Sequence, residues 1–418
     1  MYFFYQFLLF LAVICSPIIL LIRFLKDKED KKRFVEKFGF IKEKRIKGNL
    51  LWIHVASVGE LMSVLPLIHE LEKIKSIKSI LLTTSTLSSS RIFKTLKFKK
   101  TIHQFFPIDL NFFTLKFIRY WKPKIAIFID SEIWPNMFKN LKRNSIPILL
   151  MNARITNKSF KRWFFFKNFS KKVFANIDFA FPQNNETFKY LKKFEVKKIK
   201  KIGNLKFSES KKNERKNFSK NFLKSVKNRL IFCAASTHAN EEIFIAKTHI
   251  SLKKKYKNLL TIIIPRHIDR KNQIYNEMSS LGLKSIIKTS NQKIKNDTDI
   301  LIVDTYGETK KFFKISKVAF IGGSLVNHGG QNPIEPARFN LNIIHGPDTK
   351  NFKDVYKFFN KNKVAFKVNN LVQLTSITQK LLSKKRVKKI NLKKIGNSIL
   401  KRSIVEVKDI LDNEIKKT

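Results

Sequence analysis

The chain has 418 residues, which is long for a single hydrophobic core, and we expect two domains of roughly 150–200 residues each. Its 85 Lys and Arg residues against 31 Asp and Glu give a formal charge of +54, which attracts any polyanion, whether nucleic acid, anionic lipid or phosphorylated glycolipid. Lysine is scattered over nearly every predicted helix and loop, which favours a compositional bias over a dedicated binding face. The two cysteines, Cys15 and Cys233, belong to no C-x-x-C motif or Cys/His cluster, which argues against a disulfide framework and a zinc site.

Residues 2–22 form an uncharged segment, YFFYQFLLFLAVICSPIILLI, of about the ~20 residues that a helix needs to cross a bilayer. No basic region precedes it and no small-residue cleavage site ends it, so the pattern predicts an uncleaved anchor helix over residues 1–25 instead of a signal peptide. The alternative is a buried core helix. Basic residues follow the segment and none precedes it, so the positive-inside rule places the rest of the chain in the cytoplasm. These basic residues are Arg23, Lys26, Lys28, Lys31, Lys32 and Arg33.

From Leu50 onward short apolar runs alternate with longer amphipathic stretches. The runs are LLWIHVAS, SILLTTST, TIHQFFPID, KIAIFIDSE, PILLMNAR, FAFPQN and KIKKIGN. The charged stretch Ser208–Phe222 interrupts the series. The pattern then restarts with RLIFCAAST, NLLTIIIPRH, KSIIKTS, DILIVDTYGE, KVAFIGGS and LNIIHGP. Strands that alternate with helices predict mainly parallel sheets covered on both faces.

The pattern therefore predicts an α/β fold of two Rossmann-like, doubly wound domains that face a cleft. We place the first domain at residues 34–207, a linker at 208–227, the second domain at 228–390 and a helical segment at 391–418. Ligands of such sheets bind at the carboxyl ends of the strands, so site residues should directly follow strands.

The first candidate lies in LLWIHVASVGEL, where an apolar strand ends in small residues and a helix begins. Glu60 is presented at the start of that helix, with Ser57 and Gly59 beside it. The helix dipole and free backbone N–H groups favour an ionised carboxylate, which can accept a proton from a substrate hydroxyl. The alternative is that Glu60 only caps its helix.

Two further carboxylates, Asp130 and Glu132, end the strand in KIAIFIDSEIWPN. Residues two apart on a strand share a face, so we expect both side chains to point the same way. Like charges at this spacing need a polar or cationic partner, for which Arg154 after the next strand is a candidate. A structural salt bridge is the alternative to a site.

Lys206 follows Gly203 in KIGNLKF, close to the predicted linker. In a cleft its ammonium group would stabilise a departing phosphate. In a chain so rich in lysine, spacing alone gives this residue little weight.

In the second half, polar side chains again follow strands. Ser236, Thr237 and His238 lie in CAASTHANEE, and Pro265, Arg266 and His267 lie in IIIPRHIDR. Hydroxyl groups and an arginine at strand ends suit the oxygen atoms of a phosphate.

The densest signal is VAFIGGSLVNHGGQNPIEPARF, which contains four of the twelve glycines in the chain. Gly322, Gly323 and Ser324 follow a predicted strand, where glycines allow close backbone approach. The stretch 332–335, NPIE, opens a helix, whose first position tolerates proline and whose terminus attracts phosphate. Glu335 can accept hydrogen bonds from two ribose hydroxyls, so the stretch predicts a nucleotide-sugar pocket.

The chain contains no G-x-x-x-x-G-K-[ST] loop and no early G-x-G-x-x-G motif, which argues against a P-loop NTPase and a dehydrogenase. The stretches HVASVGE, IDSEIWPN, NARIT, GNLKF, STHANEE, PRH, DTYGE and GGSLVNHGGQNPIEPA occur in the order found in one family. From the N-terminal segment to about Val355 the chain resembles bacterial 3-deoxy-D-manno-octulosonic acid (Kdo) transferases of lipid A and lipopolysaccharide biosynthesis.

The resemblance implies an inverting glycosyltransferase of the GT-B type that moves Kdo from CMP-Kdo to a tetra-acylated lipid A precursor. It implies no cofactor beyond the donor and no metal in the transfer step. It also implies attachment to the anionic bacterial inner membrane, with the catalytic domains on the cytoplasmic face, and no nucleic acid partner. The aromatic and basic segment Phe160–Phe174 would then face the membrane, although a core helix with solvated lysines is the alternative.

Residue by residue, the resemblance implies that Glu60 is the general base and that Asp130 and Lys206 stabilise the transition state. The implied contacts to CMP are Pro265, Arg266, Tyr306, Gly307, Glu308, Asn332, Pro333, Ile334 and Glu335. Three places depart from the family pattern, which has Glu at the position of Asp130, Met at that of Tyr306 and Glu-Gly at that of Ala239-Asn240. Two alternatives stay open: another nucleotide-sugar enzyme on the same fold, or a membrane-tethered binder of polyanions.

Overall fold

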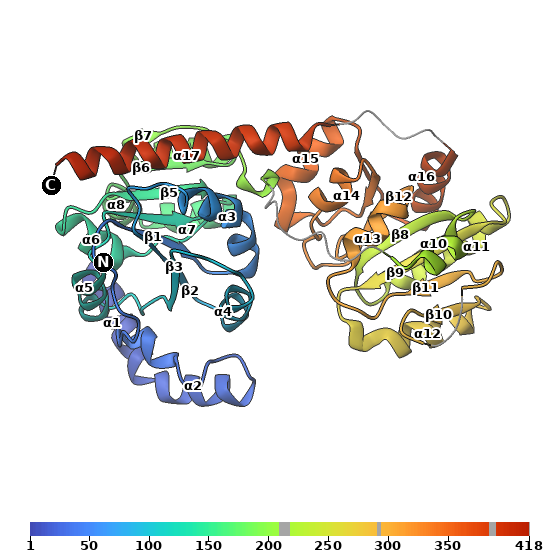
Figure 1. The fold of residues 1–418 in the computed structure, drawn as a ribbon, viewed down its shortest axis with the longest axis horizontal. Coiled ribbons are helices and arrows are strands. Elements are labelled where there is room, and N and C mark those ends of the chain that lie inside the picture. The colour runs from blue at the N-terminus through green and yellow to red at the C-terminus, as the bar shows by residue number, and fades with distance from the viewer. Residues whose placement is uncertain (209–217, 291–293, 384–389, 418) are drawn as a thin grey trace. The chain divides into compact units, whose positions relative to one another are not determined.

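The computed structural model describes residues 1–208, 218–290, 294–383 and 390–417. The chain forms two compact units, residues 1–211 with 393–418 and residues 212–392 (Figure 1). Each unit contains a seven-stranded parallel sheet, which confirms the predicted α/β fold with two Rossmann-like domains. Part of the predicted linker, residues 209–217, lies outside the described residues, and its described part contains the helix α10 (Lys220–Val226).

The sheet of the first unit has the strand order β3-β2-β1-β4-β5-β6-β7. Its strands are β1 (Leu50–Val55), β2 (Ser79–Thr84), β3 (Thr101–Phe105), β4 (Ile125–Ile129), β5 (Ile148–Ala153), β6 (Phe179–Pro182) and β7 (Lys198–Ile199). The connecting helices are α3 (Val58–Leu71), α4 (Leu87–Lys94), α5 (Asn111–Trp121), α6 (Pro135–Arg143), α7 (Asn157–Phe165), α8 (Lys167–Phe174) and α9 (Asn185–Lys193). Two short 3-10 helices, η1 (Phe34–Phe38) and η2 (Leu205–Phe207), complete the connections.

Alternation along the buried strands divides the core of this unit into two layers. Leu50 and Trp52 of β1 pack in the layer formed with α5, α6, α8 and α9. Leu51 and Ile53 point to the opposite face, where α3 covers the sheet. Both faces are thus buried, as a parallel sheet requires.

The C-terminal helix α17 (Leu392–Lys416) belongs to the first unit and completes its second layer (Figure 1). Ile399, Val407 and Leu411 of α17 are buried in the same cluster as α3. The contact is close at Gly396, where an added Cβ would lie 2.2 Å from the backbone oxygen of Phe207. The predicted C-terminal helical segment is therefore one helix, and its apolar residues are part of the core of the first unit.

The N-terminal segment differs from the prediction of one continuous helix. It forms two helices, α1 (Tyr2–Ile14) and α2 (Ser16–Leu25), bent by 54° at the break between them. Pro17 in the first turn of α2 has no N–H to continue the hydrogen-bond ladder of α1, which explains the break. Among the described residues, no single helix is both long and apolar enough to cross a membrane.

The second unit repeats the architecture with the order β10-β11-β9-β8-β12-β13-β14. Its strands are β8 (Leu230–Thr237), β9 (Leu259–Pro265), β10 (Ser285–Ile287), β11 (Ile300–Ile302), β12 (Val318–Ile321), β13 (Asn342–His345) and β14 (Ala365–Lys367). The helices after α10 are α11 (Glu241–Lys253), α12 (Lys271–Ser280), α13 (Thr309–Ile315), α14 (Ile334–Arg338), α15 (Lys353–Lys361) and α16 (Leu371–Ser383), with η3 (Ile268–Arg270) and η4 (Lys350–Phe352). All thirteen predicted strands are present, and within the described residues β14 is the one strand that was not predicted.

The substitution Gly396→Ala should destabilise the first unit. The added methyl group would overlap the Phe207 carbonyl, and overpacking of this kind costs about 1–3 kcal/mol in the free energy of unfolding. Lys401→Ala, at an exposed position of the same helix, is the matched control. Denaturant unfolding measures both variants, and equal stability of Gly396→Ala and wild type would contradict the packing of α17 described above.

Candidate active site

The candidate site of the first unit lies where the strand order reverses. β1 and β4 are neighbours in the sheet, but the chain proceeds from β1 towards β2 and from β4 towards β5. Glu60 follows β1, and Asp130 follows β4. Such a switch point is where ligands of open parallel sheets bind.

Glu60 is held by reciprocal hydrogen bonds with the residues before α3. Ser57 is the N-cap, and its Oγ accepts from the backbone N–H of Glu60 at 3.3 Å. The Glu60 carboxylate in turn accepts from the Ala56 N–H at 2.7 Å and from Ser57 Oγ at 3.1 Å. This resembles a capping box. Glu60 therefore does cap its helix, and these hydrogen bonds hold its carboxylate at the end of β1.

At Gly59, next to Glu60, packing does not require a glycine, because an added Cβ would come no closer than 3.9 Å to Ser57 Oγ.

The pKa of Glu60 is raised to about 7, mainly by burial and also by the nearby carboxylates of Glu132 and Asp130. The hydrogen bonds from Ala56 and Ser57 lower it, but they do not outweigh burial. At neutral pH the Glu60 carboxyl group is therefore only partly ionised, because burial opposes the effect of the helix terminus. A pKa near neutral pH is the value that suits a general base, because the group is partly ionised and still basic.

Asp130 lies just beyond β4, with a left-handed backbone (φ 63°) and a buried side chain. Its Oδ2 is 3.9 Å from Nζ of Lys206. Burial raises the pKa of Asp130, Lys206 and Arg154 lower it, and Glu132 raises it. Because the chain leaves the extended conformation here, the argument that Asp130 and Glu132 share a strand face is wrong.

Glu132 has partners of its own. Its Oε2 lies 3.2 Å from Nε2 of His54 and accepts from Nε1 of Trp134 at 3.0 Å. His54 is fully buried in β1 and contacts Thr83 Oγ1 at 2.9 Å through Nδ1. His54 was not predicted as a site residue, although a lone histidine in the otherwise apolar strand LLWIHV is a signal that could have indicated it.

Lys206 is positioned by two asparagines. Asn152, in the irregular end of β5, accepts from the backbone N–H of Leu205 at 3.0 Å, and Asn204 accepts from that of Lys206 at 2.9 Å. Arg154 donates its backbone N–H to the Asp130 carbonyl at 2.9 Å. The structure thus brings together Glu60, Asp130, Glu132, Arg154 and Lys206 at one edge of the sheet.

In the second unit, Glu241 holds the glycine-rich turn after β12. Its carboxylate is fully buried and accepts from the backbone N–H groups of Gly323, Ser324 and Leu325 at 2.7–3.0 Å, and from that of His238 at 3.0 Å. This residue was missed, although STHANEE places it at the start of the helix after β8. The amides of Gly323 and Ser324 therefore bind a carboxylate of the protein itself.

The glycines of this turn serve internal packing. A Cβ at Gly322 would lie 2.4 Å from the backbone oxygen of Ser236, and Gly323 has a left-handed φ of 65°. Ser324 Oγ accepts from the Gly346 N–H at 2.8 Å, which ties the turn to the end of β13. The turn after β12 is therefore locked against the end of β8.

At the end of β8 the chain bulges at Ser236 (φ 57°), and the ladder resumes between Thr237 and Pro265. The Thr237 Oγ1 is buried and makes no hydrogen bond within the described part of the chain. His238 stacks on His328, with ring centroids 4.3 Å apart, and lies 6.1 Å from His267. Burial and the neighbouring His328, His267 and Arg266 lower the pKa of His238 to about 4.

The other predicted nucleotide contacts lie in two loops. Tyr306 is exposed, and Gly307 has the left-handed φ of 76°. Glu308 accepts from Lys311 at 2.7 Å and pairs with Lys288 at 2.6 Å, so its pKa falls to about 2 although burial opposes the shift. The Glu308 carboxylate is thus already paired with two lysines of the same unit.

The predicted helix start at NPIE is present but short. Pro333 is the N-cap of α14, which has five residues, and Asn332 Oδ1 accepts from the Ile334 N–H at 3.0 Å. Asn332 therefore shapes the turn. For the Glu335 carboxylate the structure gives no hydrogen bond or ion pair to any residue that it describes.

Comparison with known proteins places the chain in a family. Residues 32–209 match the family model described as 3-deoxy-D-manno-octulosonic-acid transferase (Kdotransferase). A 3-deoxy-D-manno-octulosonic acid transferase of Rickettsia bellii is 34% identical over 90% of this chain and 90% of its own length. The enzyme of the same name from Haemophilus influenzae is 31% identical over 93% of this chain and 92% of its own length. The chain belongs to the Kdo transferase family.

The fold agrees with this assignment. A solved UDP-GlcNAc 2-epimerase from Neisseria meningitidis bound to UDP-GlcNAc aligns over 88% of this chain and 100% of its own, with a TM-score of 0.55 and 11% identity. At that identity the likeness shows the fold alone, which is the GT-B type predicted from the resemblance. This Kdo transferase is a glycosyltransferase, and the family model covers every predicted site residue of its first unit, from Ser57 to Lys206.

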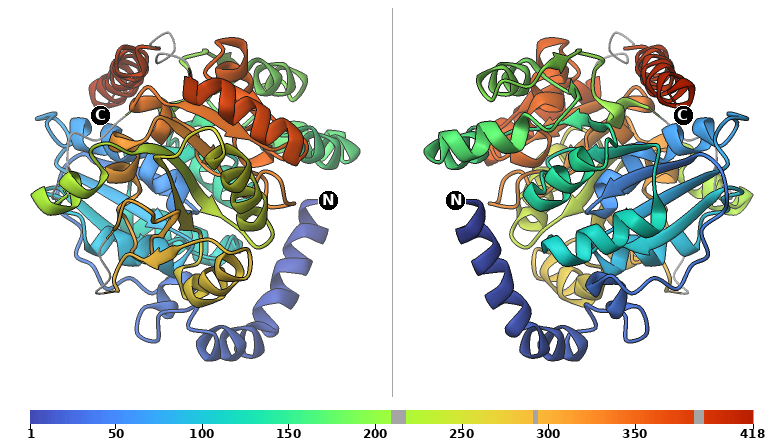
Figure 2. Two further views of the ribbon diagram at one scale, coloured as in Figure 1. Left: turned by 90° about the vertical axis from the view of Figure 1, so that its right-hand side faces the viewer. Right: turned by 90° about the vertical axis from the view of Figure 1, so that its left-hand side faces the viewer.

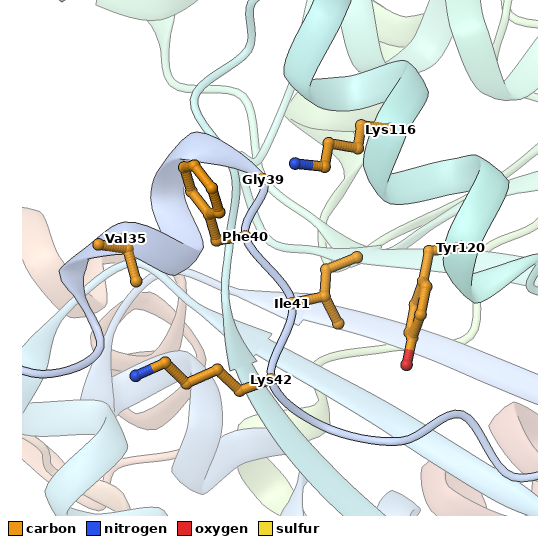
Figure 3. A pocket seen from close by; sticks show the side chains of 7 residues that line it. All are labelled: Val35, Gly39, Phe40, Ile41, Lys42, Lys116 and Tyr120. Carbon is orange, nitrogen blue, oxygen red and sulfur yellow. The ribbon is translucent and has the colours of Figure 1, made fainter.

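A separate hollow of about 460 Å³ lies on the first unit between the segment after η1 and the helix α5 (Figure 3). Its lining is mainly apolar, with Lys42 and Lys116 at its edge, and it contains none of the predicted site residues. Among the described residues, no three His, Cys, Asp or Glu side chains form a group that would hold a metal ion.

The raised pKa of Glu60 predicts a pH dependence of stability. In the unfolded chain this carboxyl group ionises near its ordinary value of 4.5, and in the folded chain near 7. Between these values the unfolded state has lost the proton and the folded state keeps it, so stability falls as pH rises from 4.5 to about 7. Glu60→Gln removes this titrating group. From pH 4.5 to 8 the free energy of unfolding of the wild type should therefore fall by about 1–3 kcal/mol relative to that of the variant. Denaturant unfolding at several pH values measures the difference, and parallel curves would show that burial does not raise this pKa.

Proposed function

We propose that the protein transfers Kdo from CMP-Kdo to a hydroxyl group of a tetra-acylated lipid A precursor, with inversion at the anomeric carbon. Glu60 acts as the general base, and the transfer step uses no metal ion and no cofactor. The observation that supports this most directly is the Glu60 carboxylate, which is held at the switch point of the first sheet with a pKa of about 7. The resemblance to relatives named Kdo transferases supplies the donor sugar.

In the proposed step, Glu60 accepts the proton of the acceptor hydroxyl while the oxygen attacks the anomeric carbon of Kdo. The bond between that carbon and the phosphate oxygen breaks, and its electron pair leaves with CMP. The carboxylate must be ionised to accept the proton. Because burial, Glu132 and Asp130 raise its pKa, the ionised form is also more basic than an ordinary glutamate.

Negative charge develops on the departing phosphate, and we assign Lys206 to stabilise it. Its ammonium group lies 3.9 Å from Asp130, in a position set by Asn152 and Asn204. Fixed charges of this kind stabilise a transition state without reorganising. The proposal that no metal is needed rests on the leaving group, which carries a single phosphate.

The donor nucleotide is assigned to the second unit. Arg266 is exposed at the end of β9, beside His238 and His267, and supplies donors for a phosphate. Tyr306 is two-thirds exposed (66%), which leaves its ring available for a base, and Glu335 is assigned to the ribose. These assignments carry over the family pattern.

The acceptor is a membrane lipid, so we propose that the protein works at the cytoplasmic face of the bacterial inner membrane, held by its N-terminal segment. The apolar side chains of α1 and α2 are largely exposed, and basic residues follow them directly. Apolar insertion combined with basic residues favours an anionic membrane surface.

Glu60→Gln should lower kcat by about 10²–10⁴-fold, because the amide cannot accept the proton. The wild-type rate should rise with pH through a midpoint near 7, and the residual rate of the variant should lack that limb. The assay follows CMP release and the mass of the lipid product, with purified protein in detergent, CMP-Kdo and the lipid A precursor, with and without a chelator.

Glu70→Gln on the same helix is the matched control, because Glu70 pairs only with the exposed Lys73 in the described structure. Its activity should equal that of the wild type. Full activity of a folded Glu60→Gln variant would show that Glu60 is not the general base. No transfer by folded wild type would contradict the donor and acceptor, and other nucleotide sugars would then be tested. Product masses also count the Kdo residues added.

Lys206→Met should lower kcat by about 10²–10³-fold with a smaller effect on the KM for CMP-Kdo, because the proposed contact strengthens as the phosphate departs. Lys201→Met, at an exposed position of the same segment, is the control and should keep full activity. A change in KM alone would instead place Lys206 in ground-state binding.

A further inference from the structure

The beginning of the N-terminal segment is bound to the body of the first unit. The Tyr5 hydroxyl donates to Oδ2 of Asp109 at 2.8 Å. Asp109 is buried and also accepts from the backbone N–H groups of Asn136 and Met137 at the start of α6. The rings of Tyr2 and Phe169 of α8 form a T-shaped contact, with centroids 5.0 Å apart.

The end of the same segment is bound to the same unit. Arg23, in the last turn of α2, donates to the buried carboxylate of Glu29 at 2.9 Å. Glu29 also pairs with Lys37 of η1 at 2.7 Å, and the carbonyl of Lys37 accepts from Ile108 after β3. Both ends of the segment 2–25 therefore lie on one globular unit.

Between these two attachments, α1 and α2 (dark blue in Figure 2) carry apolar side chains that are exposed. Those at least 40% exposed are Phe3, Phe4, Phe7, Leu8, Phe10, Leu11, Ile14, Ile18, Ile19, Leu21, Ile22 and Leu25. At 1.5 Å per residue the 13 residues of α1 rise about 20 Å and the 10 residues of α2 about 15 Å, so neither covers the ~30 Å hydrocarbon core of a bilayer.

We propose that α1 and α2 form a monotopic anchor, which enters one leaflet of an anionic bilayer and returns to the side on which the first unit lies. A helix that crosses the membrane must have its two ends on opposite sides. Here Tyr2 and Tyr5 at one end, and Arg23 at the other, contact the same water-facing body. The inference rests on the membrane location proposed above, but it changes the topology from a span to an insertion into one leaflet.

Charge and aromatic side chains extend the proposed membrane face from α1 onto α7 and α8. Phe165 is 81% exposed, and Phe164 and Phe166 are also exposed. Lys161 and Lys167 are exposed beside them, on the elements that meet Tyr2 through Phe169. At the other end of the anchor, the exposed residues Lys26, Lys28, Lys31 and Lys32 follow α2. Basic and aromatic groups around an apolar insertion favour anionic headgroups.

A protease-protection experiment tests the topology. The full chain carries one cleavable tag ahead of Met1 and another after Thr418, and is studied in sealed, inverted inner-membrane vesicles whose cytoplasmic face points outward. We expect the protease to remove both tags to the same extent without detergent. Removal of only the C-terminal tag, with the N-terminal tag protected until detergent is added, would overturn the proposal.

Cross-linking tests the attachment of Tyr2 in the same vesicles. The Lys139 Nζ lies 4.7 Å from the centre of the Tyr2 ring, so Tyr2→Cys with Lys139→Cys should be joined by a short bis-maleimide. Both variants are made in a Cys15→Ser, Cys233→Ser background. Ile14→Cys with Lys139→Cys is the control, because the far end of α1 is about 18 Å further along the helix. Failure of the first pair to react in the vesicles would equally overturn the proposal.

These readouts do not depend on catalysis. The inactive Glu60→Gln variant should give the same cleavage and cross-linking as the wild type. A failed transferase assay would therefore leave the topology result intact, and a protected N-terminal tag would leave the assignment of Glu60 intact.

Discussion

The adjacency of β1 and β4 is the constraint on which the first unit depends. Since the chain leaves these strands in opposite directions, their following loops diverge and expose the carboxyl edge of the sheet. Glu60 and Asp130 lie at that edge because each directly follows one of the two strands. Lys206 joins them because the next strand, β5, ends in Asn152, whose side chain holds the backbone of η2. The strand order thus places the site residues together, and their polar and charged neighbours then shift the pKa values of Glu60 and Asp130.

Buried carboxylates have dedicated partners in a chain of such high positive charge. The Glu241 carboxylate accepts hydrogen bonds from four backbone N–H groups. The Asp109 carboxylate accepts from two backbone N–H groups and from the Tyr5 hydroxyl, and Glu29 pairs with two cations. A buried ion without partners is costly, so these contacts are conditions for burial. The many lysines remain mostly at the surface, and net charge alone therefore says little about the site.

The strands and the strand-end positions of Glu60, Asp130, Arg266 and Gly322 could be predicted from the sequence because both follow from local patterns. Contacts between distant segments could not. Glu241 and His54 owe their roles to partners that are remote in sequence, Gly323 and Glu132. Local patterns can single out each residue, but they do not identify its partner. The same holds for α17, whose apolar face matches the first sheet although the chain reaches it after the second unit. The proline at position 17 is a local signal for a bend, but the apolar composition of the segment favoured one long helix.

The shorter side chain of Asp130, where the family pattern has glutamate, is compatible with the proposed chemistry because of its backbone. The left-handed conformation at Asp130 turns the residue out of the strand, and its carboxylate still comes within 3.9 Å of Lys206. Asparagine and aspartate adopt this conformation more readily than longer side chains do. The pairing with Lys206 lowers the pKa of Asp130 while burial raises it. Glu60 feels the remaining negative charge, and that field contributes to the pKa near 7 on which the proposed proton transfer depends.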